Sequence, residues 1–347
     1  MKNEGIQLLR VFLFLGIVVF HFGLSGSALL WGGVETFFLL SAYFLTKKLL
    51  RKNSICVLGE LKKRIKRLYP MYIVIIIFTF VVVLVAKKRF AFDELIIHCA
   101  FLQNFYWMCY SKSSLFMTFS AHTWTLGIEI WLFLIWVICF KYIKNEQRRK
   151  IFNVIMIFLA IGYRTFAIKM NVDALAISLF PLGHADAFAI GSLLALDDKK
   201  VNNRRSSILF CTIGGILIIS SVIVTSNINH IGIIDGYNLY KDSANYFNNI
   251  FTGNIYAYIL LLSAGIVKSC LSIEEFRIPL FSQLAKAGNY TYGAYLVHWP
   301  IRTVLLHFVS GNILWAIFVA VISITCAYVF EKNIKSYFMN RCERLVG

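Results

Sequence analysis

Apolar residues run along this chain in long stretches that are separated by short polar segments. An α-helix needs about 20 mainly apolar residues to cross the hydrocarbon core of a bilayer. Because backbone polar groups in lipid must be satisfied within the protein, stretches of this kind are predicted to be helices. Ten stretches fit this description, namely 6–24, 29–46, 69–86, 121–143, 151–168, 174–196, 207–225, 250–267, 289–309 and 312–330.

The segments between these stretches predict no additional domain. The longest are 87–120, 226–249 and 268–288, and none contains a low-complexity tract. We therefore predict an all-α integral membrane protein with about ten transmembrane helices in one bundle, residues 1–347 forming a single polytopic membrane domain. Met1–Gly5 leads into the first stretch without a small-residue cleavage site, so we expect this helix to be retained.

Composition and charge support the membrane class and predict the topology. Of the 347 residues, 59% are hydrophobic and only 15% are charged, which lies outside the range of soluble domains. With the N-terminus inside, 26 of the 35 Lys and Arg residues fall in inner segments, seven in outer segments and two within stretches. This positive-inside pattern predicts that both termini are cytoplasmic, and it explains the net charge of +18 without a nucleic-acid partner.

Two ionisable residues, Arg10 and His21, interrupt the first stretch. Eleven helical residues separate two side chains by about 16 Å along the axis and by roughly 20° around it. Ionisable groups at this depth usually face a bundle interior or a water-filled cavity and mark a functional site. The alternative for Arg10 is a side chain that extends to the inner headgroups.

Carboxylates and imidazoles occur in several other stretches. Glu129 stands among aliphatic residues and therefore needs a partner, for which an imidazole is a good candidate. Glu35 is expected to bind an amide or an Arg unless it is catalytic. Asp186 lies in the sixth stretch, and His298 in the ninth is either a satisfied buried histidine or a functional one.

The segment before the third stretch carries a basic cluster. Arg64 and Arg67 are three residues apart, so on a helix they project from neighbouring positions that suit contacts with phosphate oxygens. The alternatives are binding to anionic lipid and a role in topology alone. The eight cysteines have no CxxC spacing and predict no metal site, while Cys99 and Cys109 either pair or remain two free thiols.

Taken in order, these residues resemble the signature motifs of the acyltransferase-3 family, and the resemblance covers nearly the whole chain. Residues 1–347 are similar to the transmembrane-only type of this family. Arg10 and His21 match R-x10-H, Gly32–Ser41 resembles GGVDxFFxxSG, Arg64–Pro70 matches RxxR followed by RxYP, His122–Glu129 resembles HTWSLxxE, His184–Gly191 resembles RxDxxxxG, and Tyr292–Pro300 resembles YGxYLxHxP.

Several positions depart from the family pattern. Glu35 stands where the family usually has Asp, and His184 stands where it has Arg. Ala42 replaces a Gly, and Ile130 and Trp131 replace a second Glu and a Gln. The pair Arg10 and His21 in the first stretch is intact. Because of the departures, the family's contacts to the acceptor cannot be assigned to this chain residue by residue.

The resemblance implies transfer of an acetyl group from cytoplasmic acetyl-CoA, used as a substrate, to a hydroxyl of a bacterial surface polysaccharide or its lipid-linked precursor at the plasma membrane. It implies that Arg64 and Arg67 bind the donor phosphates and that Arg10 binds the pantetheine arm. His21 then acts as a general base or takes the acetyl itself, and Glu129 orients it. Substrate-binding or structural polar roles fall to Glu35, Ser41, His122, Trp124, Asp186 and His298.

Two other function classes compete with acyl transfer. A transporter or flippase for a lipid-linked glycan also needs polar groups inside a bundle, but the sequence has no matching broken helices in two halves. A noncatalytic sensor or scaffold would tolerate the loss of His21. No tightly bound cofactor is expected, and the sequence does not specify the acceptor, the acyl chain or the oligomeric state.

Overall fold

The computed structural model describes residues 3–197 and 204–335, and every regular element within those ranges is helical. This confirms the predicted all-α class for the described residues. The longer helices are α1 (Glu4–His21), α2 (Gly33–Leu50), α3 (Val57–Lys87), α7 (Trp124–Tyr142), α8 (Glu146–Lys169), α10 (Ala185–Leu196), α11 (Arg204–Ile228), α15 (Ile255–Leu271), α17 (Thr291–Leu305) and α18 (Ile313–Val329).

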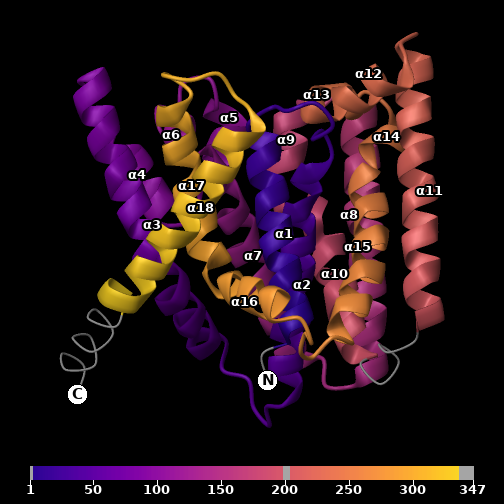
Figure 1. Cartoon of the computed structure of the whole chain (residues 1–347). Helices are drawn as coiled ribbons and strands as arrows, with labels where there is room; N and C mark the ends of the chain where they lie inside the picture. Colours follow the sequence, from indigo (N-terminus) through magenta and orange to yellow (C-terminus); the bar gives the residue numbers. More distant parts are fainter. Residues whose placement is uncertain (1–2, 198–203, 336–347) are drawn as a thin grey trace, which may run out of the picture.

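Short helices and single turns connect the longer ones. Short helices α5, α6, α9, α12 and α13 gather toward the upper end of the bundle in Figure 1. The short α-helices are α4 (Phe92–Cys99), α5 (Gln103–Tyr110), α6 (Met117–Ser120), α9 (Ala174–Leu179), α12 (Ile233–Asn238), α13 (Ser243–Tyr246), α14 (Ile250–Gly253) and α16 (Pro279–Ala287); the 3₁₀ turns are η1 (Leu30–Gly32), η2 (Ala121–Thr123), η3 (Pro181–His184), η5 (Leu239–Lys241) and η6 (Gly288–Tyr290), and a π-helical turn, η7 (Phe330–Lys335), follows α18.

Six helical segments of the described chain are long and apolar enough to cross a membrane: α1, α3, α6–α7, α8, α11 and α18. The other four predicted stretches coincide with α2, α9–α10, α15 and α17, which are shorter or less apolar. The helices thus occur where the sequence predicted them, while the count of ten spans stays a prediction. The start of α1 and the end of α18 lie toward the same end of the bundle (Figure 1).

Helix α3 is longer than the sequence predicted, because it begins at Val57 rather than near residue 69. Leu, Lys, Arg and Glu are good helix formers, so the basic segment continues the apolar helix, and Pro70 is accommodated inside it. A helix of 31 residues is about 46 Å long and exceeds the ~30 Å hydrocarbon core. Arg64 and Arg67 therefore lie on an ordered extension of a spanning helix.

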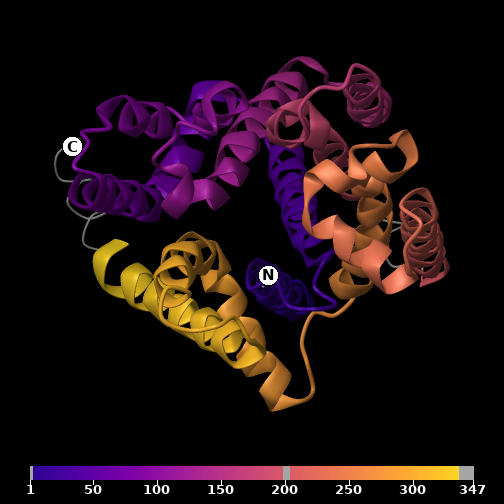
Figure 2. The same cartoon turned by 90° about the horizontal axis from the view of Figure 1, so that it is seen from above.

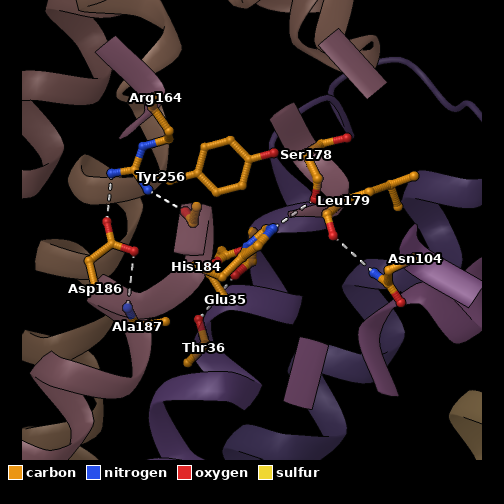
Figure 3. Close-up of polar contacts among 12 residues, drawn as sticks. Glu35, Thr36, Asn104, Arg164, Ser178, Leu179, His184, Asp186, Ala187 and Tyr256 are labelled. Carbon is orange, nitrogen blue, oxygen red and sulfur yellow. Dashed lines mark hydrogen bonds and ion pairs between the residues drawn. The ribbon is translucent and has the colours of Figure 1, made fainter. Parts of the chain in front are cut away.

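The sixth predicted stretch, 174–196, is not one continuous helix, so this prediction was wrong. Helix α9 ends at Leu179, Phe180 is extended, and η3 begins at Pro181 before α10 starts. The physical reason is Pro181, which disfavours a helical conformation at the preceding residue. Carbonyls freed at the break bind side chains: Leu179 O accepts from Asn104 Nδ2 at 3.2 Å (Figure 3).

Helix α1 contacts α2, α15, α16, α17 and α18, so it lies inside the assembly. Viewed from above, α1 runs between the α16–α18 group and the remaining helices (Figure 2). Helices α2 and α10 also pack tightly, because Gly191 has no side chain where a Cβ would lie 2.1 Å from Leu39 O. Both cysteines on the predicted outer side, Cys99 and Cys109, are free thiols.

Candidate active site

A cavity of about 470 Å³ lies among α1, α2, α3, α7 and α17. Its walls combine apolar side chains, mostly from α2, with a concentration of cations. Lys48 and Lys63 lie at its exposed margin, with side chains 47% and 65% exposed. The polar and charged residues that line it are Gln7, Arg10, Ser41, Lys48, Glu60, Lys63, Arg64, Arg67, Thr125, Glu129, Thr291, Tyr292 and Tyr295.

Glu129 in this cavity pairs with a guanidinium and a hydroxyl. Arg64 forms an ion pair with Glu129 through Nη2. Ser41 Oγ donates a hydrogen bond to Glu129 Oε1 at 2.6 Å, and Arg64 Nη2 donates to Ser41 Oγ at 3.0 Å. The expected pairing of Glu129 with His21 is therefore corrected, because the α3 extension brings Arg64 beside the carboxylate.

Three guanidinium groups surround this carboxylate. Arg10 of α1 lines the same cavity and interacts electrostatically with Glu129, Arg64 and Arg67. Arg64 Nη2 is hydrogen-bonded to Glu129 and Ser41, whereas the buried Nε of Arg64 has no hydrogen-bond partner. Since three cations face one carboxylate here, the cavity favours an anionic group.

His21 lies outside this cavity, at the last residue of α1. Its ring stacks on that of His298, with centroids 5.3 Å apart and planes 24° apart, and meets the Trp299 ring edge-on at 4.6 Å. Arg302 Nε donates a hydrogen bond to the His21 carbonyl at 2.9 Å. His21 as a whole residue is only partly buried, although aromatic rings of Phe20, His298 and Trp299 pack around its imidazole.

His122 joins His21 and His298, and we call these three residues the imidazole cluster. The His122 and His298 ring centroids are 5.4 Å apart. Both of these side chains are buried, with exposures of 2% and 0%. The sequence placed the three histidines in three different motifs, and the fold brings them together.

Tyr295 connects the cavity with the imidazole cluster. It lines the cavity, and its ring centroid lies 5.2 Å from that of His298 and 5.6 Å from that of His122. Its hydroxyl donates to the His122 carbonyl at 3.0 Å. One layer of aromatic side chain therefore separates the cationic cavity from the imidazoles.

A second buried polar network lies beside α2 and contains Asp186 (Figure 3). Arg164 of α8 donates to Asp186 Oδ2 at 2.6 Å, to Gly183 O at 2.5 Å and to Asn254 Oδ1 at 3.2 Å. Arg164 and Asp186 are 1% and 0% exposed, so this is a buried ion pair with additional hydrogen bonds. Removing one partner of such a pair leaves a buried charge without a counter-ion and strongly lowers the stability of the fold.

Arg164 is one of the seven cations that the positive-inside count assigns to outer segments, so sequence reasoning missed its buried role. A signal was available, since Arg164 falls inside the predicted stretch 151–168 and a lone arginine there needs a buried anion. The structure identifies that anion as Asp186.

Glu35 and His184 form a buried pair next to these contacts, because His184 directly follows Gly183 in the chain. The His184 Nδ1 to Glu35 Oε1 distance is 2.7 Å, and His184 Nε2 donates to Ser178 O at 2.8 Å. Since a carbonyl only accepts, Nε2 carries a hydrogen, and one further proton is shared between Nδ1 and the carboxylate. The ring centroids of Trp124 and His184 are 5.4 Å apart, so Trp124 packs against this pair.

The predicted site residues thus fall into three groups. Glu35 and His184 contact each other. At both positions an ionisable residue replaces the ionisable residue that the family usually has. The cavity contains Arg10, Ser41, Arg64, Arg67 and Glu129; the imidazole cluster contains His21, His122 and His298; and the buried network contains Glu35, Trp124 and Asp186.

Comparisons with known proteins identify relatives of this chain. A Staphylococcus aureus protein of strain COL, provisionally named an O-acetyltransferase, is 25% identical over 352 aligned positions, which cover 94% of this chain and 55% of that protein. O-acetyltransferase OatA of strain NCTC 8325 is 27% identical over 155 positions, covering 41% of this chain and 25% of OatA. The chain therefore spans about half the length of the first of these relatives, and no solved structure matches it.

The family model described as an acyltransferase domain matches residues 3–332, nearly the whole chain. This match includes all three groups of site residues. The chain belongs to the acyltransferase-3 family.

Proposed function

We propose that this protein is a membrane-embedded O-acyltransferase that moves acetyl from cytoplasmic acetyl-CoA to a hydroxyl of a bacterial surface polysaccharide or its lipid-linked precursor. The observation that carries the proposal is the position of the cationic cavity, which lies one aromatic layer from the imidazole cluster that includes His21. The family membership and the names of the relatives support the reaction class.

The charge of the cavity supports an anionic donor. Arg67 and Lys63 lie on the exposed part of α3 and are suited to bind phosphate oxygens. Arg10 lies further along the cavity wall on α1, where a neutral amide-containing arm would accept its hydrogen bonds. The volume of about 470 Å³ is within the range of small-molecule sites.

His21 supplies the reacting group. It is the last residue of α1, next to the buried imidazoles and outside the cationic cavity, so we expect an acceptor hydroxyl to approach it from the end of the helix. Two routes are consistent with this position. In one, His21 removes the hydroxyl proton during attack on the thioester; in the other, His21 accepts the acetyl and passes it on.

The test compares wild-type protein with His21→Ala in proteoliposomes that contain radiolabelled acetyl-CoA and a purified surface glycan. We expect wild-type protein to label the glycan and His21→Ala to lose labelling while it folds normally. His307→Ala is the matched control, because His307 is exposed in the turn after α17 and its ring nitrogen lies 2.7 Å from the nearby Thr303 O. Normal labelling by His21→Ala, or glycan movement across the bilayer without consumption of acetyl-CoA, contradicts the proposal.

A further inference from the structure

The backbone of α17 fixes the protonation of two buried histidines. Pro300 has no N–H, so it cannot donate to the carbonyl four residues earlier, at Leu296. His122 Nε2 takes that place and lies 3.0 Å from Leu296 O. His298 Nδ1 lies 2.5 Å from Tyr295 O. Because carbonyl oxygens only accept, His122 carries its hydrogen on Nε2 and His298 carries its hydrogen on Nδ1.

The opposite ring nitrogens have no partner. His122 Nδ1 and His298 Nε2 are both buried, and neither has a hydrogen-bond partner. A buried acceptor without a donor costs about 1–3 kcal/mol. In these neutral tautomers both atoms carry a lone pair, so two fixed bases lie in the imidazole cluster beside His21.

We propose that His298 is a second catalytic residue of the acyl transfer, in which His21 carries the acetyl group and His298 Nε2 takes the proton of the acceptor hydroxyl. The His298 ring stacks on His21 with centroids 5.3 Å apart, so the unpaired Nε2 belongs to the ring next to the one that would carry the acetyl group. His122 packs edge-on against His298 and stacks on Trp299, so it holds the second base in place.

The transfer has two balanced steps. In the first, a His21 ring nitrogen bonds to the thioester carbonyl carbon, the C–S bond breaks, and the proton of the other ring nitrogen passes to the leaving thiolate. In the second, the acceptor oxygen bonds to the acetyl carbon as the bond to His21 breaks, and the hydroxyl proton passes to His298 Nε2. His298 then returns this proton to His21, so no external acid or base is consumed.

The inference rests on the proposed function and predicts that only the second step depends on His298. The diagnostic variant is His298→Asn, because the Asn amide N–H keeps the donor to Tyr295 O while the base is removed. Steady-state glycan acetylation should fall by about 10²–10⁴-fold, the usual contribution of a general base. The release of about one equivalent of CoA per protein, and the radiolabel retained on the protein, should persist in His298→Asn and be absent in His21→Ala.

Each outcome separates the inference from the proposed function. If His298→Asn turns over at the wild-type rate, or if it loses the CoA burst together with turnover while folding normally, the two-histidine scheme is wrong although acetyl transfer stands. If wild-type protein transfers no acetyl, the proposed function itself fails. Added imidazole should restore part of the turnover of His298→Ala but none of that of His21→Ala, and His307→Ala should retain full turnover.

Discussion

The ion pair between Glu35 and His184 allows a quantitative test of how the site is held. Both side chains are fully buried, and the replacement Glu35→Leu keeps a similar volume while removing the carboxylate. His184 then loses its Nδ1 partner in a site that water does not reach. Removing one partner of a buried ion pair typically costs about 3–5 kcal/mol.

This cost should appear as a lower midpoint of thermal unfolding in detergent. For domains of about 150–250 residues, 1 kcal/mol corresponds to about 2–4 °C, so we expect a decrease of about 5–10 °C for the larger helical bundle. On the proposed function, acetyl transfer should fall as well, because Phe37 and Phe38 of the same helix line the cationic cavity. Tryptophan fluorescence during heating measures the first effect and glycan labelling the second.

The control is Glu146→Leu, which removes the same group from an exposed pair. Glu146 lies 3.0 Å from Lys150, but its side chain is 64% exposed, and Lys150 keeps Asp197 as a second partner at 2.7 Å. Exposed pairs contribute about 0–1 kcal/mol, so the midpoint should move by no more than about 2 °C. An equal effect of the two replacements would refute the reasoning from burial.

A double replacement tests whether the two family departures form one unit. Glu35→Asp shortens the anion and His184→Arg lengthens the cation, which restores the residues that the family usually has at these positions. The double variant should be more stable than the sum of the two single variants by about 0.5–3 kcal/mol, the coupling typical of residues in contact. Simple additivity would show that Glu35 and His184 were exchanged independently.

Three further predictions concern other parts of the fold. Arg67→Ala should raise the KM for acetyl-CoA about tenfold in steady-state kinetics and leave kcat nearly unchanged, because the proposed phosphate contact would persist in the transition state; a fall in kcat alone would contradict this role. Gly191→Val should lower the unfolding midpoint, because its Cβ would lie 2.1 Å from Leu39 O and overpacking costs about 1–3 kcal/mol; an unchanged midpoint would mean that α2 and α10 separate at no cost. Burial lowers the pKa of His98 from its usual 6.5 to about 4, so between these pH values the unfolded state binds more protons than the folded state. The free energy of unfolding should therefore fall by about 3 kcal/mol as the pH decreases through this range. His98→Gln should flatten this pH dependence, which thermal unfolding at a series of pH values measures.

Much of the fold follows from the sequence because the bilayer constrains apolar stretches strongly. Each of the ten predicted stretches contains helix, and both Arg10 and His21 lie on one helix as expected. Asn254 also divides the predicted stretch 250–267 into α14 and α15. Two other failures of the predicted boundaries have a local cause. Polar helix formers extended α3 to Val57, and Pro181 broke the stretch between α9 and α10.

The pairing of polar groups followed the sequence less closely. The sequence required a partner for Glu129, but it did not identify Arg64, which is distant in the chain and reaches the carboxylate only because α3 is long and continuous. The same limitation applies to Arg164, whose buried partner Asp186 lies on another helix. A hydropathy pattern specifies which groups must be satisfied, but not by which neighbours.

The sequence by itself determined the helical class, the approximate positions of the helices and the set of polar residues that lipid would exclude. It also determined that one carbonyl of α17 lacks its helical donor, because Pro300 has no N–H. Only the tertiary structure decided that this carbonyl binds His122, that three histidines meet, and that Glu129 lies with Arg64 instead. The reason is physical: the energy of burying a residue depends on its own chemistry, whereas the choice of partner depends on how distant helices pack.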